Sequence, residues 1–191
     1  MTAALRVPLP ATAAERKLRA RIGGICRSLR IAALAYPVWE LALIVWHWSD
    51  RDGLTGYYSA LLKVPIADIA LWQRGTAVAF HLAAWLLVAR ACLEVYRLFG
   101  GFLIGEVFCP EAAARLRRTA LFGLAAVVAG ILIRPVLTVL VTLGNPPDQR
   151  AIGLLFAPQD LLNVLFLVGF LALAEVFRAA AEIAAENAEF V

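Results

Sequence analysis

The sequence predicts an all-α integral membrane bundle of four transmembrane helices, with an N-terminal interfacial amphipathic helix and a cytoplasmic C-terminal helical extension. Hydrophobic residues make up 62% of the chain and charged residues only 17%, whereas soluble domains average about half apolar and a quarter charged. The apolar excess is gathered into four long runs, which is typical of a multi-pass membrane protein. No Gly/Ser linker or low-complexity segment divides the chain, so we expect a single domain, residues 1–191.

The four apolar runs cover roughly residues 31–48, 76–96, 119–143 and 161–177. Each is about long enough to cross a hydrocarbon core of about 30 Å as a helix. Lipid offers no hydrogen-bonding partners, and a helix satisfies its own backbone groups, which favours helices over open strands. Stretches such as LALIVWHW are apolar on every side and do not alternate, which argues against the alternative of a small β-barrel.

The segment before the first run predicts an amphipathic helix in the membrane interface. Leu18, Ile22, Ile25 and Leu29 recur at helical spacing, with basic residues around them. The glycine pair at residues 23–24 lowers helix propensity and predicts a bend. No small-residue cleavage site follows the first apolar run, so we expect that run to be retained rather than removed as a signal peptide.

Basic residues predict the orientation of the chain in the membrane. They crowd the segment before the first run and the loop at residues 97–118, and they are sparser in the other two loops. The positive-inside rule therefore places both termini and the 97–118 loop in the cytoplasm. Cys26, Cys92 and Cys109 then lie near the cytoplasmic side, where thiols stay reduced, and their spacing matches no zinc or redox motif.

The segment GEVFCPEAAARLRR, residues 105–118, concentrates charge in an otherwise apolar chain. Pro110 and Glu111 suit the first turn of a new helix, and the arginines hold the third run at the cytoplasmic surface. The alternative is a docking surface for a cytoplasmic protein or for lipid headgroups. The candidate docking residues are Glu106, Glu111, Arg115, Arg117 and Arg118, with the acidic tail of Glu182, Glu186 and Glu189 beside them.

The same segment, extended as GEVFCPEAAARLRRTA, resembles the central motif of a bacterial four-helix inner-membrane family labelled domain of unknown function 2975. The C-terminal stretch LAEVFRAAAEIAAENAEFV is similar to the end of that family. Cys109 stands where the family has Thr, which predicts a weaker helix cap. The resemblance implies a bacterial inner (plasma) membrane protein, often encoded beside a small helix-turn-helix regulator that would be its cytoplasmic partner. It implies no enzymatic activity.

Charged residues inside the apolar runs are the second candidate site. A charge in lipid costs at least about 2.5–3.5 kcal/mol, so such side chains should face the bundle and find partners. We expect Arg90 to pair with Glu175, and Glu40 to pair with Arg134 or His81. The pairs either hold the helices together or form an ion or ligand site. The candidate intramembrane polar site is Glu40, His81, Arg90, Arg134 and Glu175.

The sequence contains no P-loop, no H-E-x-x-H and no G-x-S-x-G motif, so we expect no enzyme, no cofactor and no metal site. The net charge of +4 comes mainly from the positive-inside residues, so direct nucleic-acid binding is not indicated. The leading hypothesis is an accessory or sensory inner-membrane protein that acts through a cytoplasmic partner. The alternative is a small carrier or ligand-binding bundle. A cavity with two or more unpaired ionisable groups would favour the carrier, whereas closed ion pairs would favour the partner hypothesis.

The orientation can be tested with reporter fusions. A fusion at Val191 should report a cytoplasmic location, and a fusion within residues 50–73 should report the opposite side, because the basic residues are biased in that direction. A C-terminal reporter that is active only outside the cytoplasm would reverse the orientation.

Overall fold

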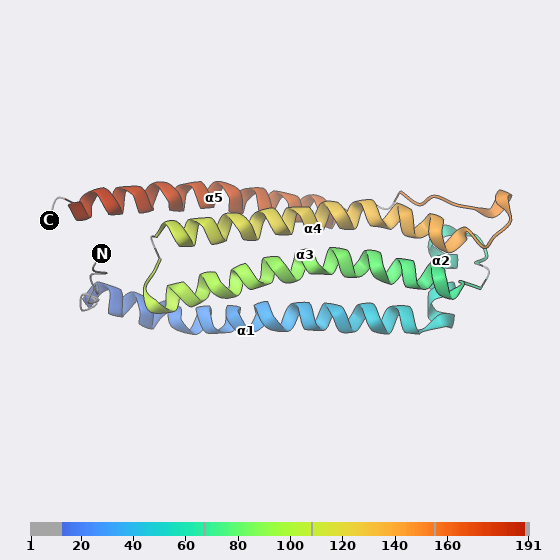
Figure 1. Ribbon diagram of the computed structural model, residues 1–191, viewed down its shortest axis with the longest axis horizontal. Helices are drawn as coiled ribbons and strands as arrows, with labels where there is room; N and C mark the ends of the chain where they lie inside the picture. Colours follow the sequence, from blue (N-terminus) through green and yellow to red (C-terminus); the bar gives the residue numbers. More distant parts are fainter. Residues whose placement is uncertain (1–12, 67, 108, 155, 190–191) are drawn as a thin grey trace, which may run out of the picture.

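The computed structural model describes residues 13–66, 68–107, 109–154 and 156–189, and it is all-helical over these ranges. The long helices are α1 (Ala13–Ser49), α3 (Leu71–Ile104), α4 (Pro110–Thr142) and α5 (Pro158–Glu189), and the short elements are α2 (Arg51–Leu62) and the 3-10 turn η1 (Pro147–Gln149) (Figure 1). All four long helices contain segments apolar and long enough to cross a membrane. The predicted class, an all-α multi-pass membrane protein, is therefore confirmed.

The long helices pack in the order in which they follow one another in the chain. α1 packs on α3, α3 on α4, and α4 on α5, each antiparallel to its neighbour (Figure 1). The four helices thus form an open row, in which α3 separates α1 from α4 and α4 separates much of α3 from α5. One end of the row carries the α3–α4 connection, residues 105–109, together with the start of α1 and the end of α5. We call it the charged end, and the opposite end the α2 end.

Helix α1 begins earlier than the first predicted span and is continuous. The N-terminal segment is helical, as expected, but it continues into the span without a separate interfacial helix, and the glycine pair at residues 23–24 does not interrupt it. Among the described residues, no atom outside the helix lies within 4 Å of where a Cβ would stand on either glycine. Ile25 and Leu29 are exposed, and the side chains of Leu18 and Ile22 lie outside the described part.

Helix α2 was missed by the sequence analysis, which treated residues 50–73 as a loop. Asp50 caps the helix by accepting a hydrogen bond from the Gly53 N–H at 3.0 Å. The helix stops at Lys63, whose φ of 55° is left-handed. α2 lies across the end of the long helices (Figure 1) and buries Leu54 and Tyr58 against them. The available signal was Asp50 followed by apolar residues at helical spacing.

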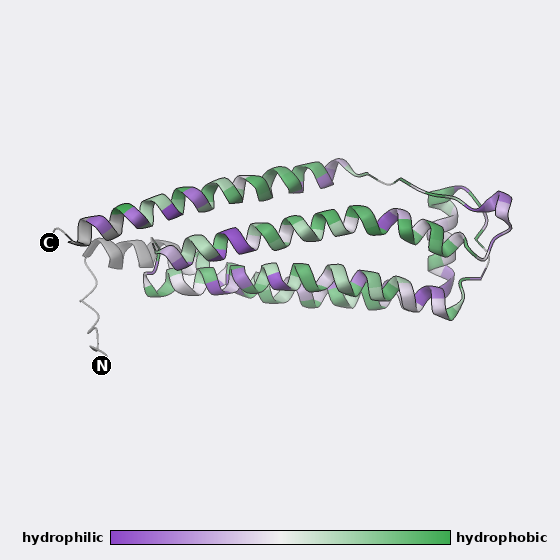
Figure 2. Cartoon of the chain, turned by 45° about the horizontal axis from the view of Figure 1, so that its top comes forward, coloured by the Kyte–Doolittle hydropathy of each residue, from purple (hydrophilic) through white to green (hydrophobic). Residues whose placement is uncertain are grey.

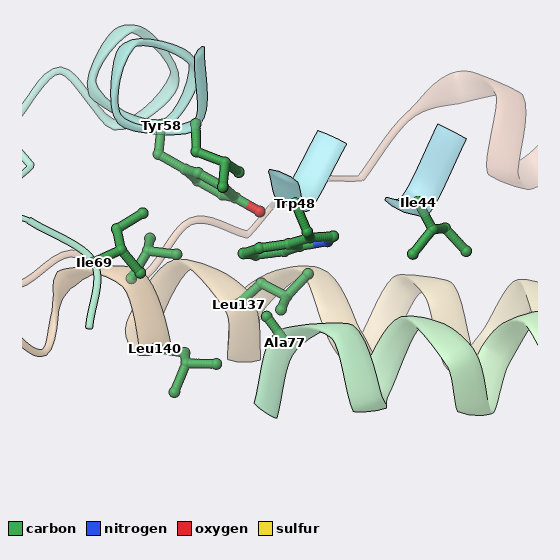
Figure 3. Packing of buried hydrophobic residues seen from close by; sticks show 9 residues of the cluster. Ile44, Trp48, Tyr58, Ile69, Ala77, Leu137 and Leu140 are labelled. Atoms are coloured by element: carbon green, nitrogen blue, oxygen red, sulfur yellow. The ribbon is translucent and has the colours of Figure 1, made fainter. Parts of the chain in front are cut away.

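The largest buried apolar cluster lies where α2 covers the bundle (Figure 3). Trp48 from α1, Tyr58 from α2, Ala77 from α3 and Leu137 from α4 meet there. Burial raises the pKa of Tyr58 to about 12, and the neighbouring Tyr57 adds to the shift. Away from this cluster many large apolar side chains are exposed along the helices, which suits surfaces that face acyl chains rather than water.

Buried polar side chains join the connecting segments to α4. Gln73 donates to the Leu140 carbonyl at 2.7 Å, and Asn145 donates to the Pro65 carbonyl at 2.6 Å. After η1 the chain returns along α4 in an extended form (Figure 1), and the Gly153 N–H donates to the Thr138 hydroxyl at 2.9 Å. The bonds to Pro65 and Gly153 satisfy backbone groups that lie outside the helices.

We predict that the α2-end core carries much of the folding stability. Trp48 is 5% exposed and Trp46 is 71% exposed, although they are two residues apart on α1. Trp48→Ala should lower the free energy of unfolding in detergent by about 3–5 kcal/mol, whereas Trp46→Ala should change it by less than about 0.5 kcal/mol. Thermal unfolding followed by circular dichroism measures both, and equal losses would contradict the assignment.

Candidate functional site

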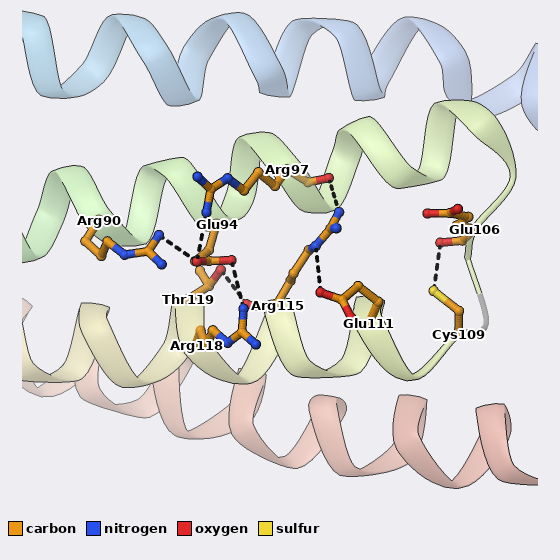
Figure 4. Close-up of polar contacts among 9 residues, drawn as sticks. All are labelled: Arg90, Glu94, Arg97, Glu106, Cys109, Glu111, Arg115, Arg118 and Thr119. Atoms are coloured by element: carbon orange, nitrogen blue, oxygen red, sulfur yellow. Dashed lines mark hydrogen bonds and ion pairs between the residues drawn. The ribbon is translucent and has the colours of Figure 1, made fainter. Parts of the chain in front are cut away.

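A fully buried carboxylate, Glu94 on α3, organises the charged end of the bundle (Figure 4). Its Oε1 lies 2.6 Å from Nη1 of Arg90 and 3.6 Å from Nη1 of Arg97, and its Oε2 lies 4.0 Å from Nη1 of Arg118 on α4. Glu94 is 0% exposed, while the three arginine side chains are 37%, 54% and 50% exposed. The carboxylate is thus enclosed by protein, whereas the three arginine side chains that surround it stay partly exposed (Figure 4).

A second set of contacts ties the start of α4 to the end of α3. Arg115 Nη1 donates to the Arg97 carbonyl at 2.9 Å, and Arg115 Nε lies 3.7 Å from Oε1 of Glu111 (Figure 4). α3 ends at Gly105, whose φ of 94° is left-handed. α4 begins at Pro110 as expected, and its N-cap Cys109 provides no side-chain cap, which agrees with the weaker cap that the sequence predicts.

The five candidate docking residues do not share one face. Arg115 and Arg118 contact α3, whereas Arg117 makes no such contact and lines a cleft toward α5, which Arg118 also borders. Glu106 and Glu111 are exposed on the connection and on the first turn of α4. In the acidic tail Glu182 lies 3.1 Å from Arg178, Glu186 is exposed, and the side chain of Glu189 is outside the described residues.

The predicted pair of Arg90 and Glu175 is wrong. Arg90 pairs with Glu94 on its own helix, and Glu175 accepts a hydrogen bond from Arg178 Nε at 2.9 Å, one turn further along α5. α3 and α5 lie on opposite sides of α4 over most of their length, so the two side chains are not brought together.

The expected pairing of Glu40 with Arg134 is also wrong. Arg134 makes a two-pronged contact with Asp160 in the first turn of α5, with N–O distances of 2.5 and 2.8 Å. Asp160 also accepts from the Ala157 N–H at 2.9 Å. Because α3 lies between α1 and α4, Glu40 on α1 and Arg134 on α4 do not meet.

His81 does not supply the alternative partner for Glu40. Its Nδ1 lies 3.0 Å from the Ala77 carbonyl, and its ring packs against Trp48 with centroids 5.6 Å apart. The Oε2 atom of Glu40 is buried and makes no hydrogen bond to any residue that the structure describes. The five intramembrane residues therefore do not converge on one site.

Glu94 and Asp160, the acidic partners of Arg90 and Arg134, belong to neither of the two sites predicted from the sequence. A signal for Glu94 was available in its spacing four residues after Arg90, which places both on one helix face. A signal for Asp160 was its position shortly after Pro158, in the first turn of the fourth apolar helix, where the dipole favours an anion.

The ion pairs around Glu94 and the pair of Arg134 with Asp160 lie on either side of a stretch of α4 that has no charged residue. Residues 119–133 lie between Arg118 and Arg134, and fifteen residues of helix rise about 22 Å. Such a band fits the hydrocarbon core when the flanking arginines extend toward the two polar surfaces. Over the described residues no group of three His, Cys, Asp or Glu side chains could hold a metal ion. The contacts that these clusters make are ion pairs and hydrogen bonds.

Comparison with models of protein families gives no match, and comparisons with curated proteins and with solved structures return no similar protein.

We predict that Glu94 contributes to stability through Arg90 and not through Glu175. Glu94→Gln should lower the free energy of unfolding by about 1–3 kcal/mol, because it leaves buried and half-buried donors without their counter-charge. Glu175→Gln should change it little, because that pair is exposed. Each variant is then combined with Arg90→Gln in a double-mutant cycle. Coupling of Arg90 with Glu175, and none with Glu94, would refute the assignment.

Proposed function

We propose that the chain is an inner-membrane accessory or sensory protein that acts through a cytoplasmic partner bound at the charged end. The observation that carries the proposal is the exposed acidic pair Glu106 and Glu111 on the α3–α4 connection. It lies at the same end as the first turns of α1 and the last turns of α5 (Figure 1). A surface formed by one short connection and two projecting helix ends is suited to a protein partner.

The projecting end of α5 supports the proposal. Figure 2 shows a mainly hydrophobic surface over the middle of the long helices and hydrophilic residues recurring in the last turns of α5. From Glu175 to Glu189 this helix continues for about 21 Å at 1.5 Å per residue. A helix that only spans a membrane has no need of such an extension.

The closed ion pairs also favour the partner hypothesis over the carrier alternative. Arg90, Arg134 and Glu175 each have a charged partner in the structure, namely Glu94, Asp160 and Arg178 respectively. A carrier of ions or polar ligands needs several ionisable groups that converge on a cavity. Glu40 has a buried oxygen without a hydrogen-bond partner among the described residues, and a single such group is weak support. Glu175 lines the cleft between α4 and α5, but it is paired there with Arg178.

The charge of the surface defines the chemistry of the partner. Glu106, Glu111 and Glu186 are exposed and acidic, so the partner should present a basic patch, with association that weakens as salt rises. The helix-turn-helix regulator that the family resemblance implies is one candidate of this kind.

The docking surface can be tested by neutralising the acidic pair. In membranes from the native host, a photo-crosslinking residue at Val107 should capture a cytoplasmic protein. Glu106→Gln/Glu111→Gln should reduce that product at least about tenfold, which corresponds to about 1.4 kcal/mol. The matched control is Asp52→Asn/Asp68→Asn, which removes two exposed carboxylates at the α2 end and should leave the product unchanged. Equal products from both double variants would sink the proposal.

A further inference from the structure

A cleft of about 620 Å³ opens between α4 and α5 at the charged end. Its polar lining consists of Arg117 and Arg118 from α4 and of Glu175 and Arg178 from α5. Leu121 forms part of its apolar wall. The cleft is separate from the acidic pair on the α3–α4 connection, and its polar lining carries two more positive than negative charges.

The fold leaves part of this positive charge unused. Arg178 is neutralised by Glu175 at 2.9 Å, and Arg118 shares Glu94 at a distance of 4.0 Å. Arg117 is exposed, and it makes no ion pair or side-chain hydrogen bond with any residue that the structure describes. A guanidinium carries five N–H donors in a planar fork that matches the oxygens of a phosphate group. The cleft therefore has donors available for an anion.

The position of the cleft indicates an amphipathic ligand. Arg117 and Arg118 directly precede the charge-free band of α4, residues 119–133, so they lie where phospholipid phosphates meet the hydrocarbon core. Beyond the arginines, the cleft is lined by the exposed apolar side chain of Leu121 on α4 and by Ala174 on α5. A soluble anion would use the positive charge but not the apolar wall, whereas a phospholipid uses both.

The geometry points to an anionic phospholipid bound in the α4–α5 cleft, with its phosphate at Arg117, beside the paired arginines of the lining, and an acyl chain along Leu121. Basic pockets between transmembrane helices bind anionic headgroups in this way. The inference goes beyond the proposed docking function, because the lipid binds to the isolated chain and needs no protein partner.

The test uses the purified full-length chain in bilayer discs of phosphatidylcholine with or without phosphatidylglycerol. Native mass spectrometry after release from the discs counts the lipids of each kind that stay bound. Wild type should retain phosphatidylglycerol in preference to phosphatidylcholine. Arg117→Gln/Arg178→Gln should lower that preference at least about tenfold. The control Arg51→Gln/Lys63→Gln, which removes the same charge from exposed positions at the α2 end, should keep it.

Two further variants separate binding from folding. Arg117→Gln alone removes no ion pair or side-chain hydrogen bond among the described residues, and it should also lose preference. Arg117→Lys should retain part of it, because an ammonium still binds phosphate as a point charge. Equal retention by the cleft variants and the α2-end control would overturn the proposal, since net charge alone would then attract the lipid. Displacement of phosphatidylglycerol from wild type by inorganic phosphate would also overturn it, because the site would then take a free anion. If a variant loses the cytoplasmic protein partner but still retains phosphatidylglycerol, the docking surface is affected and the lipid proposal stands.

Discussion

The burial of one carboxylate, Glu94, constrains the charged end of this protein. An uncompensated charge inside a bilayer costs several kcal/mol, so Glu94 requires cations on its own helix and on α4. Arg90 and Arg97 supply them from α3, and Arg118 supplies one from the neighbouring helix. The contact of Glu94 with Arg118 joins α3 to α4, together with the hydrogen bond from Arg115 to the Arg97 carbonyl. α1 and α5 then add to the two outer faces of that hairpin.

The two ends of the helix row are built on different principles. The α2 end is closed by apolar packing around Trp48 and by hydrogen bonds from Gln73 and Asn145 to backbone carbonyls. The charged end is held by ion pairs whose arginines remain half exposed. Packing that excludes solvent gives a rigid end, whereas solvated charges leave donors and acceptors available to ligands. This difference is why both the protein-docking surface and the lipid cleft that we propose lie at the charged end.

The open row of helices also explains how one short charged segment can serve two purposes. Successive residues on a helix point in directions about 100° apart. On α4, Arg115 and Arg118 therefore reach α3, while Arg117 is turned to the cleft beside α5, which Arg118 also borders. In a closed four-helix ring both directions would be covered by neighbouring helices. In a row, one side of α4 remains open toward lipid between α4 and α5.

The sequence by itself determined the class of fold, the four spans and the start of α4, because these depend on local properties: apolar length, charge at the ends of each run, and the proline at residue 110. It did not determine which charges meet. Arg90 with Glu175, and Glu40 with Arg134, are plausible at the level of depth alone, and depth is all that sequence position gives. Whether two helices are neighbours depends on the packing order. In that order, α4 lies between the helices of Arg90 and Glu175, and α3 lies between those of Glu40 and Arg134. Arg90 therefore pairs with Glu94, and Arg134 pairs with Asp160. Tertiary structure alone also decided the α4–α5 cleft, because a cleft exists only where two separate helix surfaces diverge.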